Sequence, residues 1–234
     1  MYKVYLNDTL MHDPRIEELA LIDPVVELEE NKAGSFSFTM PPNHPRYDEI
    51  ERRKSILSVY QDDELIFCGA CIEVEVDFFK QKSVYCEGEL SYLNDSIIRP
   101  AKYNFTSVRE LLEIYIEKHN AQMDEDKQFE VGIVTVADPP STRMCYSNMN
   151  SAMECLKEDL VDDFGGFMRV RHEGGKRYID YLANSLNTNS QVIRLGVNLL
   201  NFKSNIDSSE LATAIIPLGA IIQSEEGEQP VQGL

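Results

Sequence analysis

The fold is decided by residues 54–100, which read KSILSVYQDDELIFCGACIEVEVDFFKQKSVYCEGELSYLNDSIIRP. Runs rich in β-branched and aromatic residues are separated here by polar breaks at 61–63 and 80–82, which predicts an antiparallel three-stranded meander. In the middle run apolar and acidic residues alternate, as is typical of a strand buried on one face. The alternation places Ile72, Val74, Val76 and Phe78 toward a core, and Glu73, Glu75 and Asp77 toward solvent or a neighbouring subunit.

The residues before this stretch continue the β pattern. Residues 2–6 and the run after Asn7-Asp8 form a candidate hairpin, because Asn and Asp tolerate tight-turn conformations. Alternation resumes at 25–29 and 35–40 and stops at Pro41-Pro42, since proline lacks the donor for a sheet hydrogen bond. Residues 1–100 thus hold about six or seven short strands, and we expect a first β-barrel-like domain over 1–100.

After this domain the apolar residues change to helical spacing. Ser107 with Glu110, and Ser151 with Glu154, form two Ser-x-x-Glu patterns that predict helix starts. Each is followed by an apolar stripe, the second ending at Gly165-Gly166. A strand at 129–136 and a hairpin across Gly174-Gly175 complete a predicted α/β domain over 101–189.

The last segment, 190–234, returns to β character and includes the apolar run 211–222. We expect it to supply strands of a second barrel-like domain, which is incomplete as it stands. The predicted fold class is therefore α+β, mainly β, with an α/β insertion between barrel-like domains.

Composition limits the function. The chain has 234 residues, with 40 acidic against 22 basic side chains and a net charge of −18. This balance argues against specific nucleic-acid binding and against docking on an anionic membrane. No secretion signal is evident, and no apolar run approaches the roughly 20 residues of a membrane span. Five cysteines, an odd number, fit a reducing compartment and free buried thiols.

Cysteine and histidine spacing predicts neither a redox centre nor a metal site. Cys68 and Cys71 form a CxxC inside a predicted strand, where positions i and i+3 face opposite ways, so ordinary strand packing is the favoured interpretation. They have no second cysteine pair, and the histidines are dispersed along the chain. We therefore expect no metal and no cofactor; the histidines are His12, His44, His119 and His172.

No catalytic residue is expected either. Cys145 or Cys155 with His119 or His172 would be the nucleophile-base candidates, but neither cysteine lies in a recognisable nucleophile motif. The sequence 159–163 contains three clustered aspartates that are more typical of a solvated helix face than of a glycosidase pair. Gly174-Gly175-Lys176 lacks the rest of a phosphate-loop pattern.

One basic patch stands out on the predicted hairpin. It is most simply a soluble hairpin tip, and the sharper hypothesis is a docking point for an acidic neighbouring subunit. Its members are Arg169, Arg171, His172, Lys176 and Arg177.

Several segments together resemble one known family. They are NHPRYDEIERRKSILSVYQDDELIFCGACIEVEV (43–76), CEGELSYLNDSIIRP (86–100), EKHNAQ (117–122), RYIDYL (177–182), GVNLL (196–200) and TAIIPLGA (213–220). In this order they resemble the prophage tail proteins of long-tailed phages, also called tail-associated lysin or endopeptidase tail proteins.

The resemblance implies a baseplate-hub protein at the virion tail tip, assembled in the bacterial host cytoplasm. It implies a homotrimer that closes the tail tube, contacts the distal tail protein and the tape-measure protein, and lets DNA pass without specific binding. Any lytic activity would belong to a C-terminal module outside these residues, so no enzyme activity is expected. The alternatives are a peptidoglycan hydrolase, or the hub of a phage-derived contractile injection system.

Overall fold

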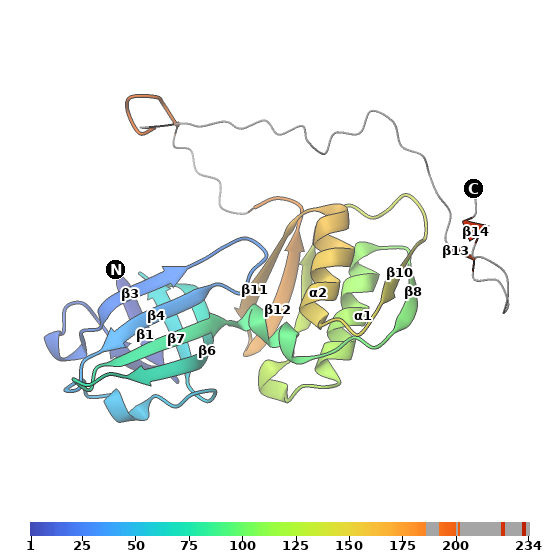
Figure 1. The fold of residues 1–234 in the computed structure, drawn as a ribbon. Coiled ribbons are helices and arrows are strands. Elements are labelled where there is room, and N and C mark those ends of the chain that lie inside the picture. Colours follow the sequence, from blue (N-terminus) through green and yellow to red (C-terminus); the bar gives the residue numbers. More distant parts are fainter. Residues whose placement is uncertain (186–191, 200, 202–220, 223–230, 233–234) are drawn as a thin grey trace. The chain divides into compact units, whose positions relative to one another are not determined.

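The computed structural model describes residues 1–185, 192–199, 201, 221–222 and 231–232. The chain divides into two compact units, Met1–Asn187 and Thr188–Leu234. The larger unit holds a seven-stranded sheet followed by a part that mixes helices and strands, here called the α/β part (Figure 1).

The seven-stranded sheet is antiparallel throughout and has the order β2-β1-β5-β6-β7-β4-β3. Among the described strands no pairing joins β2 with β3, so the sheet curls as a half barrel that stays open at these two edges. Its strands are β1 Tyr2–Leu6, β2 Thr9–His12, β3 Ile22–Glu27, β4 Ser35–Met40, β5 Ile56–Gln61, β6 Glu64–Val76 and β7 Lys82–Gly88.

The predicted meander is confirmed as β5-β6-β7, and the predicted turns lie between paired strands. Asn7 and Asp8 have φ of 46° and 67°, the left-handed values that a two-residue hairpin loop needs. The inner face of the sheet buries one apolar cluster, here called the sheet core. It includes Val4, Leu6, Met11, Phe36, Phe38, Met40, Leu57, Val59, Phe67, Cys71, Val84 and Cys86.

The alternation predicted for the middle strand is only partly right. Glu73, Glu75 and Asp77 are exposed as expected, but Val76 and Phe78 are also exposed, by 56% and 93%. A bulge lies between Cys71 and Glu73, where the register with β7 shifts. Such an extra residue reverses the faces of the strand beyond it.

Because of this bulge, Ile72 and Val74 do not share a core. Ile72 packs on the apolar cluster of the α/β part, whereas Val74 packs on the sheet core. Beyond Val74 the β6–β7 hairpin extends past the core into solvent. The predicted core positions of Val76 and Phe78 are therefore wrong.

The tip of this hairpin presents two aromatic rings. Phe78 and Phe79 are exposed by 93% and 75%, and their rings meet edge to face at 5.5 Å. The turn beneath them is held in place, because the Asp77 carboxylate accepts from the Gln81 backbone N–H at 2.7 Å and Tyr47 Oη donates to the Lys80 carbonyl at 2.7 Å. The exposed rings thus sit on an ordered turn.

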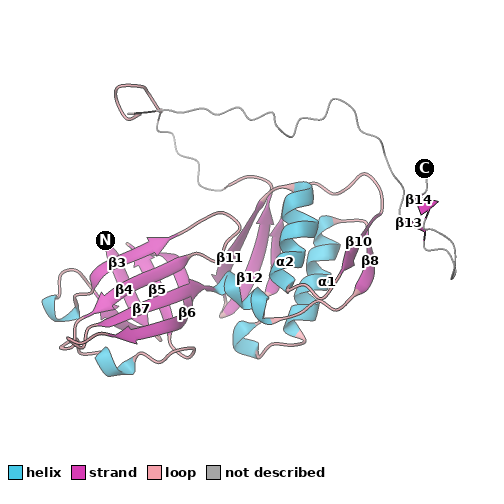
Figure 2. Cartoon of the chain, in the orientation of Figure 1, coloured by secondary structure: helices cyan, strands magenta, loops and turns pink. Residues whose placement is uncertain are grey.

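The α/β part contains two small sheets and two helices (Figure 2). One sheet pairs β8 with β10, and the other has the order β11-β12-β9, with β12 and β9 parallel. The elements are the 3-10 segment η3 Glu89–Asp95, β8 Ala101–Phe105, α1 Val108–Asn120, β9 Glu130–Val134, β10 Arg143–Ser147, α2 Ala152–Leu156, the π-helical segment η5 Lys157–Asp162, β11 Phe167–Glu173 and β12 Lys176–Leu182.

Both predicted helix starts are confirmed, but they differ in detail. At α2 the Ser-x-x-Glu pattern forms a complete capping box, in which the two residues bond to each other's backbone. Ser151 Oγ accepts from the Glu154 N–H at 3.1 Å, and the Glu154 carboxylate accepts from the Ser151 N–H at 3.0 Å. At α1, Ser107 Oγ accepts from the Glu110 N–H, while the Glu110 carboxylate binds Thr106 instead. The second helix continues as the π-helical segment η5 and ends at Gly165-Gly166, both at positive φ.

The helices and the three-stranded sheet enclose a second apolar cluster, here called the α/β core. It includes Leu90, Leu93, Ile98, Phe105, Leu111, Leu112, Tyr115, Phe129, Leu156, Leu160, Ile179 and Tyr181. The sequence did not predict β8 and β10, since 101–105 and 143–147 carry no clear alternation. Leu90 and Leu93 in η3 join this core directly after β7.

Most of the predicted final β segment lies outside the described residues, including 202–220. Residues 192–199 form a turn with Gly196 at φ 79°, in place of the strand expected at its start. A short pair, β13 Ile221–Ile222 with β14 Val231–Gln232, is antiparallel.

Candidate functional site

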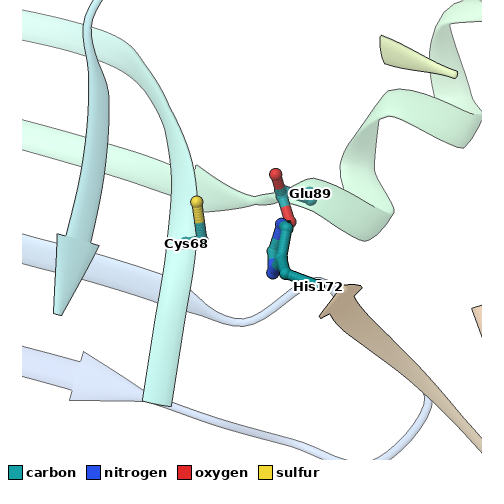
Figure 3. A group of neighbouring side chains, drawn as sticks. All are labelled: Cys68, Glu89 and His172. Atoms are coloured by element: carbon teal, nitrogen blue, oxygen red, sulfur yellow. The ribbon is translucent and has the colours of Figure 1, made fainter. Parts of the chain in front are cut away.

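A buried carboxylate lies where the large sheet passes into the α/β part. Glu89 is the first residue of η3, directly after β7, and Figure 3 shows it beside Cys68 of β6 and His172 of β11. One donor atom of each residue, the Cys68 sulfur, a Glu89 oxygen and a His172 ring nitrogen, lies within 4.8 Å of the other two. With Arg177 of β12, these residues are called the Glu89 cluster below.

The charge of Glu89 is balanced inside the chain. Its Oε1 accepts from Arg177 Nε at 2.7 Å, and its Oε2 lies 2.8 Å from His172 Nε2. Arg177 is in turn held by the Asp126 carbonyl at 2.9 Å, with its guanidinium over the rings of Tyr92 and Phe129. A buried acid with these partners is stable only as a set, because removing one partner leaves an uncompensated charge.

Cys68 is the neutral member of the cluster. Ser58 Oγ donates to its sulfur at 3.5 Å. Burial, followed by the nearby Glu89 charge, raises the pKa of the Cys68 thiol to about 12. A thiol protonated at neutral pH is a poor nucleophile, so the cluster as it stands has no activated cysteine.

The CxxC lies within β6, as predicted, and its two cysteines face different surroundings. Cys71 is fully buried in the sheet core opposite Cys86 of β7, whereas Cys68 is half-buried in the Glu89 cluster. All five cysteines are free thiols. The spacing of this motif therefore reflects strand geometry.

The nucleophile-base candidates are not brought together as a catalytic pair. His119 is fully buried, with Ser96 Oγ at 2.8 Å from Nδ1 and the Lys127 carbonyl at 3.1 Å from Nε2. Burial lowers the pKa of His119. Cys145 instead lies 3.3 Å from Tyr115 Oη, and burial raises its pKa; Cys155 is buried in α2, with its pKa raised to about 12 by burial.

The clustered aspartates also have separate roles. Asp159 accepts from Tyr115 Oη, and burial raises the pKa of this carboxyl. Asp163 pairs with Arg143 at 3.2 Å, and Asp162 is exposed. This arrangement gives no pair of carboxylates facing each other across a cleft.

The basic hairpin patch is paired within the chain. Arg169 and Arg171 both contact the buried Asp180, and Lys176 contacts Glu130. Burial raises the pKa of Asp180, but hydrogen bonds from Arg171, Arg169 and the Ile133 N–H outweigh it and lower the pKa overall. These basic side chains thus already have acidic partners within the chain, and a docking point for an acidic neighbouring subunit stays a prediction.

Sequence reasoning missed Glu89 and Asp180, the two acids around which these contacts form. Asp180 left a signal, because it is a charged residue inside the apolar strand run YIDYL and so required a buried partner. The sequence around Glu89 gives no comparable indication of burial, since Glu89 is one acid among many in an acidic sequence. Among the described residues, no helix combines the length and apolar character needed to cross a membrane.

No protein-family model matches the sequence, and no curated protein matches it. Several solved structures share its fold. The 43 kDa tail protein of prophage MuSo2 from Shewanella oneidensis aligns with 76% of this chain and 53% of its own, at 14% identity and a TM-score of 0.51. Prophage tail protein gp18 from Listeria monocytogenes aligns with 98% of this chain and 66% of its own, at 14% identity and a TM-score of 0.56.

The chain thus has a mainly β fold that it shares with prophage tail proteins. It spans about half to two thirds of the length of those proteins.

Proposed function

We propose that this chain is a structural protein of a phage tail, located in the virion and built into the hub at the tail tip. The observation that carries the proposal is the likeness to the Listeria prophage tail protein over 98% of this chain. The agreement covers the half-barrel sheet and the α/β part together, so it concerns a whole arrangement of elements. The ordered sequence segments that resemble tail proteins support the same role.

The hub role includes three copies around the tail axis, joined to the distal tail protein and the tape-measure protein. The half-barrel sheet supports this because β2 and β3 remain as edges that a neighbouring chain can cover. The net charge of −18 supports a channel through which DNA passes without adhering. The protein acts in this proposal as a scaffold, with no catalysis of its own.

The location is tested by immunogold labelling of purified virions with antibodies to residues 1–185. Labelling confined to the end of the tail is the expected result, and labelling of the capsid or of no virion part would contradict the proposal. Sedimentation equilibrium over a concentration series then tests the oligomer. A mass of three chains is expected for the assembled hub, and a dimer at every concentration would exclude threefold assembly.

The second candidate is a peptidoglycan hydrolase, as the alternative family name suggests. The arrangement of Cys145, Cys155 and His119 gives it no support. Cys145 contacts Tyr115 Oη, and both ring nitrogens of His119 bond to Ser96 and Lys127. Burial raises the pKa of the Cys155 thiol to about 12. Incubation of the purified chain with peptidoglycan distinguishes the two candidates. We expect no release of muropeptides, and release above that of a heat-denatured sample would favour the enzyme.

A further inference from the structure

The Glu89 cluster contains the donor types of a transition-metal site. Zinc in proteins is bound by cysteine sulfur, histidine nitrogen and carboxylate oxygen, in tetrahedral sites with bonds of about 2.0–2.3 Å. Cys68, Glu89 and His172 offer one of each, within 4.8 Å of one another. Ligands of such a site lie roughly 3.3–3.8 Å apart by the geometry of those bonds, so closing around an ion requires shifts of about 1 Å.

Two of the three donor residues lie at fixed positions of the backbone. Cys68 precedes Gly69 on β6, and Glu89 follows Gly88 of β7, and these two glycines are paired across the strands. A Cβ on Gly69 would lie 2.1 Å from the Glu87 carbonyl oxygen, and one on Gly88 would lie 1.9 Å from that of Ala33. The strands therefore approach so closely here that only glycine fits, which fixes where the Cys68 and Glu89 side chains start.

The third donor can adjust. The His172 side chain is 35% exposed, on a hairpin whose turn is formed by Gly174 and Gly175 at positive φ. His172 is thus a partly exposed residue in direct contact with the buried Glu89 carboxylate. A site in which two ligands have a fixed backbone and the third can adjust can close around a metal by side-chain shifts alone.

Neighbouring residues orient the donors as outer partners of a metal site do. Arg177 Nε binds Oε1 of Glu89, which leaves Oε2 directed to His172 Nε2 at 2.8 Å. Ser58 Oγ donates to the Cys68 sulfur. Hydrogen bonds of this kind to ligating groups are regular features of metal sites and fix ligand orientation.

We propose that Cys68 Sγ, Glu89 Oε2 and His172 Nε2 bind one zinc ion, with water as the fourth ligand. The ion takes the place of the proton between His172 Nε2 and Glu89 Oε2. His172 binds it as the neutral imidazole with its proton on Nδ1, and the displaced proton and the thiol proton of Cys68 pass to solvent as the sulfur becomes a thiolate. Thiolate and imidazole select zinc over magnesium or calcium. The bound ion ties β6, η3 and β11 together, so its role is to stabilise the junction between the sheet and the α/β part.

The test uses Co²⁺, which replaces Zn²⁺ and absorbs light, added to the full chain after treatment with a chelator. We expect one equivalent of Co²⁺ to produce a thiolate-to-cobalt charge-transfer band that Zn²⁺ then abolishes. Zinc at a hundredfold excess over its dissociation constant should raise the Tm by roughly 5 °C or more. Magnesium at the same concentration should leave the Tm unchanged.

Two variants remove separate donors. Cys68→Ser should lose the band, and His172→Gln should lower the Co²⁺ affinity at least tenfold. Cys145→Ser is the matched control, a half-buried thiol outside the cluster, and it should keep both the band and the affinity. Circular dichroism of each variant checks that it is folded.

Absence of a band in the unaltered chain would overturn the proposal. So would an equal affinity of the Cys68→Ser variant, because the ion would then bind elsewhere on this acidic surface. A Tm that rises equally with zinc and magnesium would likewise assign the effect to general screening of negative charge, and the Glu89 cluster would be an ion-pair contact alone.

Discussion

The large sheet and the α/β part bury their side chains by different rules. In the sheet, alternation along each strand separates the sheet core from solvent, as at Phe36, Phe38 and Met40 of β4. In the α/β part, Asp180 and His119 are fully buried and bind groups far away in the sequence, the Ile133 N–H and Ser96 Oγ. The comparison teaches that a core built on alternation can be predicted locally, whereas a core stabilised by polar contacts cannot.

The largest expected effects come from cavities made in each core. Leu57→Ala in the sheet core and Leu112→Ala in the α/β core should each lower the free energy of unfolding by about 3 kcal/mol, because both side chains are fully buried and leave unfilled space. Urea denaturation followed by fluorescence and by circular dichroism measures both losses. Since both cores belong to one compact unit, the two probes should report a single transition.

Two separate transitions in either leucine variant would show that the sheet and the α/β part unfold independently. The sheet and the α/β part would then be two separate domains, and not two cores of one cooperative unit. Leu28→Ala, at an exposed leucine, is the control and should change stability by less than about 0.5 kcal/mol.

The next largest loss of stability is expected when the buried polar contacts of the α/β part are weakened. Asp180→Asn keeps an oxygen for the Ile133 N–H but removes the charge that Arg169 and Arg171 contact. Both arginines are partly exposed and recover hydration, so we expect a loss of about 2 kcal/mol, below the usual cost of breaking a fully buried pair. Asp162→Asn, at an exposed acid in the same part, should have no measurable effect.

Acid should destabilise both regions through one buried histidine each. His44 in the sheet region and His119 in the α/β part bond through both ring nitrogens, and burial lowers the pKa of each. A lowered folded-state pKa gives stability that is complete above the unfolded pKa of about 6.5 and is lost as pH falls toward the folded value. Between pH 6.5 and 5.5 the free energy of unfolding should therefore fall, by up to about 1.4 kcal/mol per pH unit for each histidine.

Urea titrations at pH 7.5, 6.5 and 5.5 measure this slope. His119→Gln should lower stability at pH 7.5 but reduce the further loss on acidification, since its share of proton uptake is gone. An unchanged slope in that variant would show that His119 does not take part in the pH dependence.

The smallest expected effect is at the hairpin tip. Phe78→Ser should change the free energy of unfolding by less than about 0.5 kcal/mol, because the ring is almost fully exposed and packs edge to face on Phe79, which is itself exposed. Val84→Ser on the neighbouring strand β7 is the contrasting variant, since this side chain is buried in the sheet core. A large loss in the Phe78 variant would mean that the tip is covered in solution, and sedimentation velocity would then identify a self-association.

The sequence by itself determined the elements that depend on patterns within a few consecutive residues. The β5-β6-β7 meander, the turns at Asn7-Asp8 and Gly174-Gly175 and the caps at Ser107 and Ser151 follow from alternation, backbone preference and side-chain reach over a few residues. These interactions depend on neighbours in the chain. They can therefore be predicted from a short stretch of sequence, before the tertiary structure is known.

Only the tertiary structure decided the rest. The bulge after Cys71 placed Ile72 and Val74 on different cores, a change of register that depends on pairing with β7, and the β6–β7 hairpin left Val76 and Phe78 exposed beyond the sheet core. Folding also brought Cys68, Glu89 and His172 together from three elements far apart in the sequence. Spacing along the chain cannot show such a cluster, because the distances that matter for charge and for metal binding are set by packing between elements.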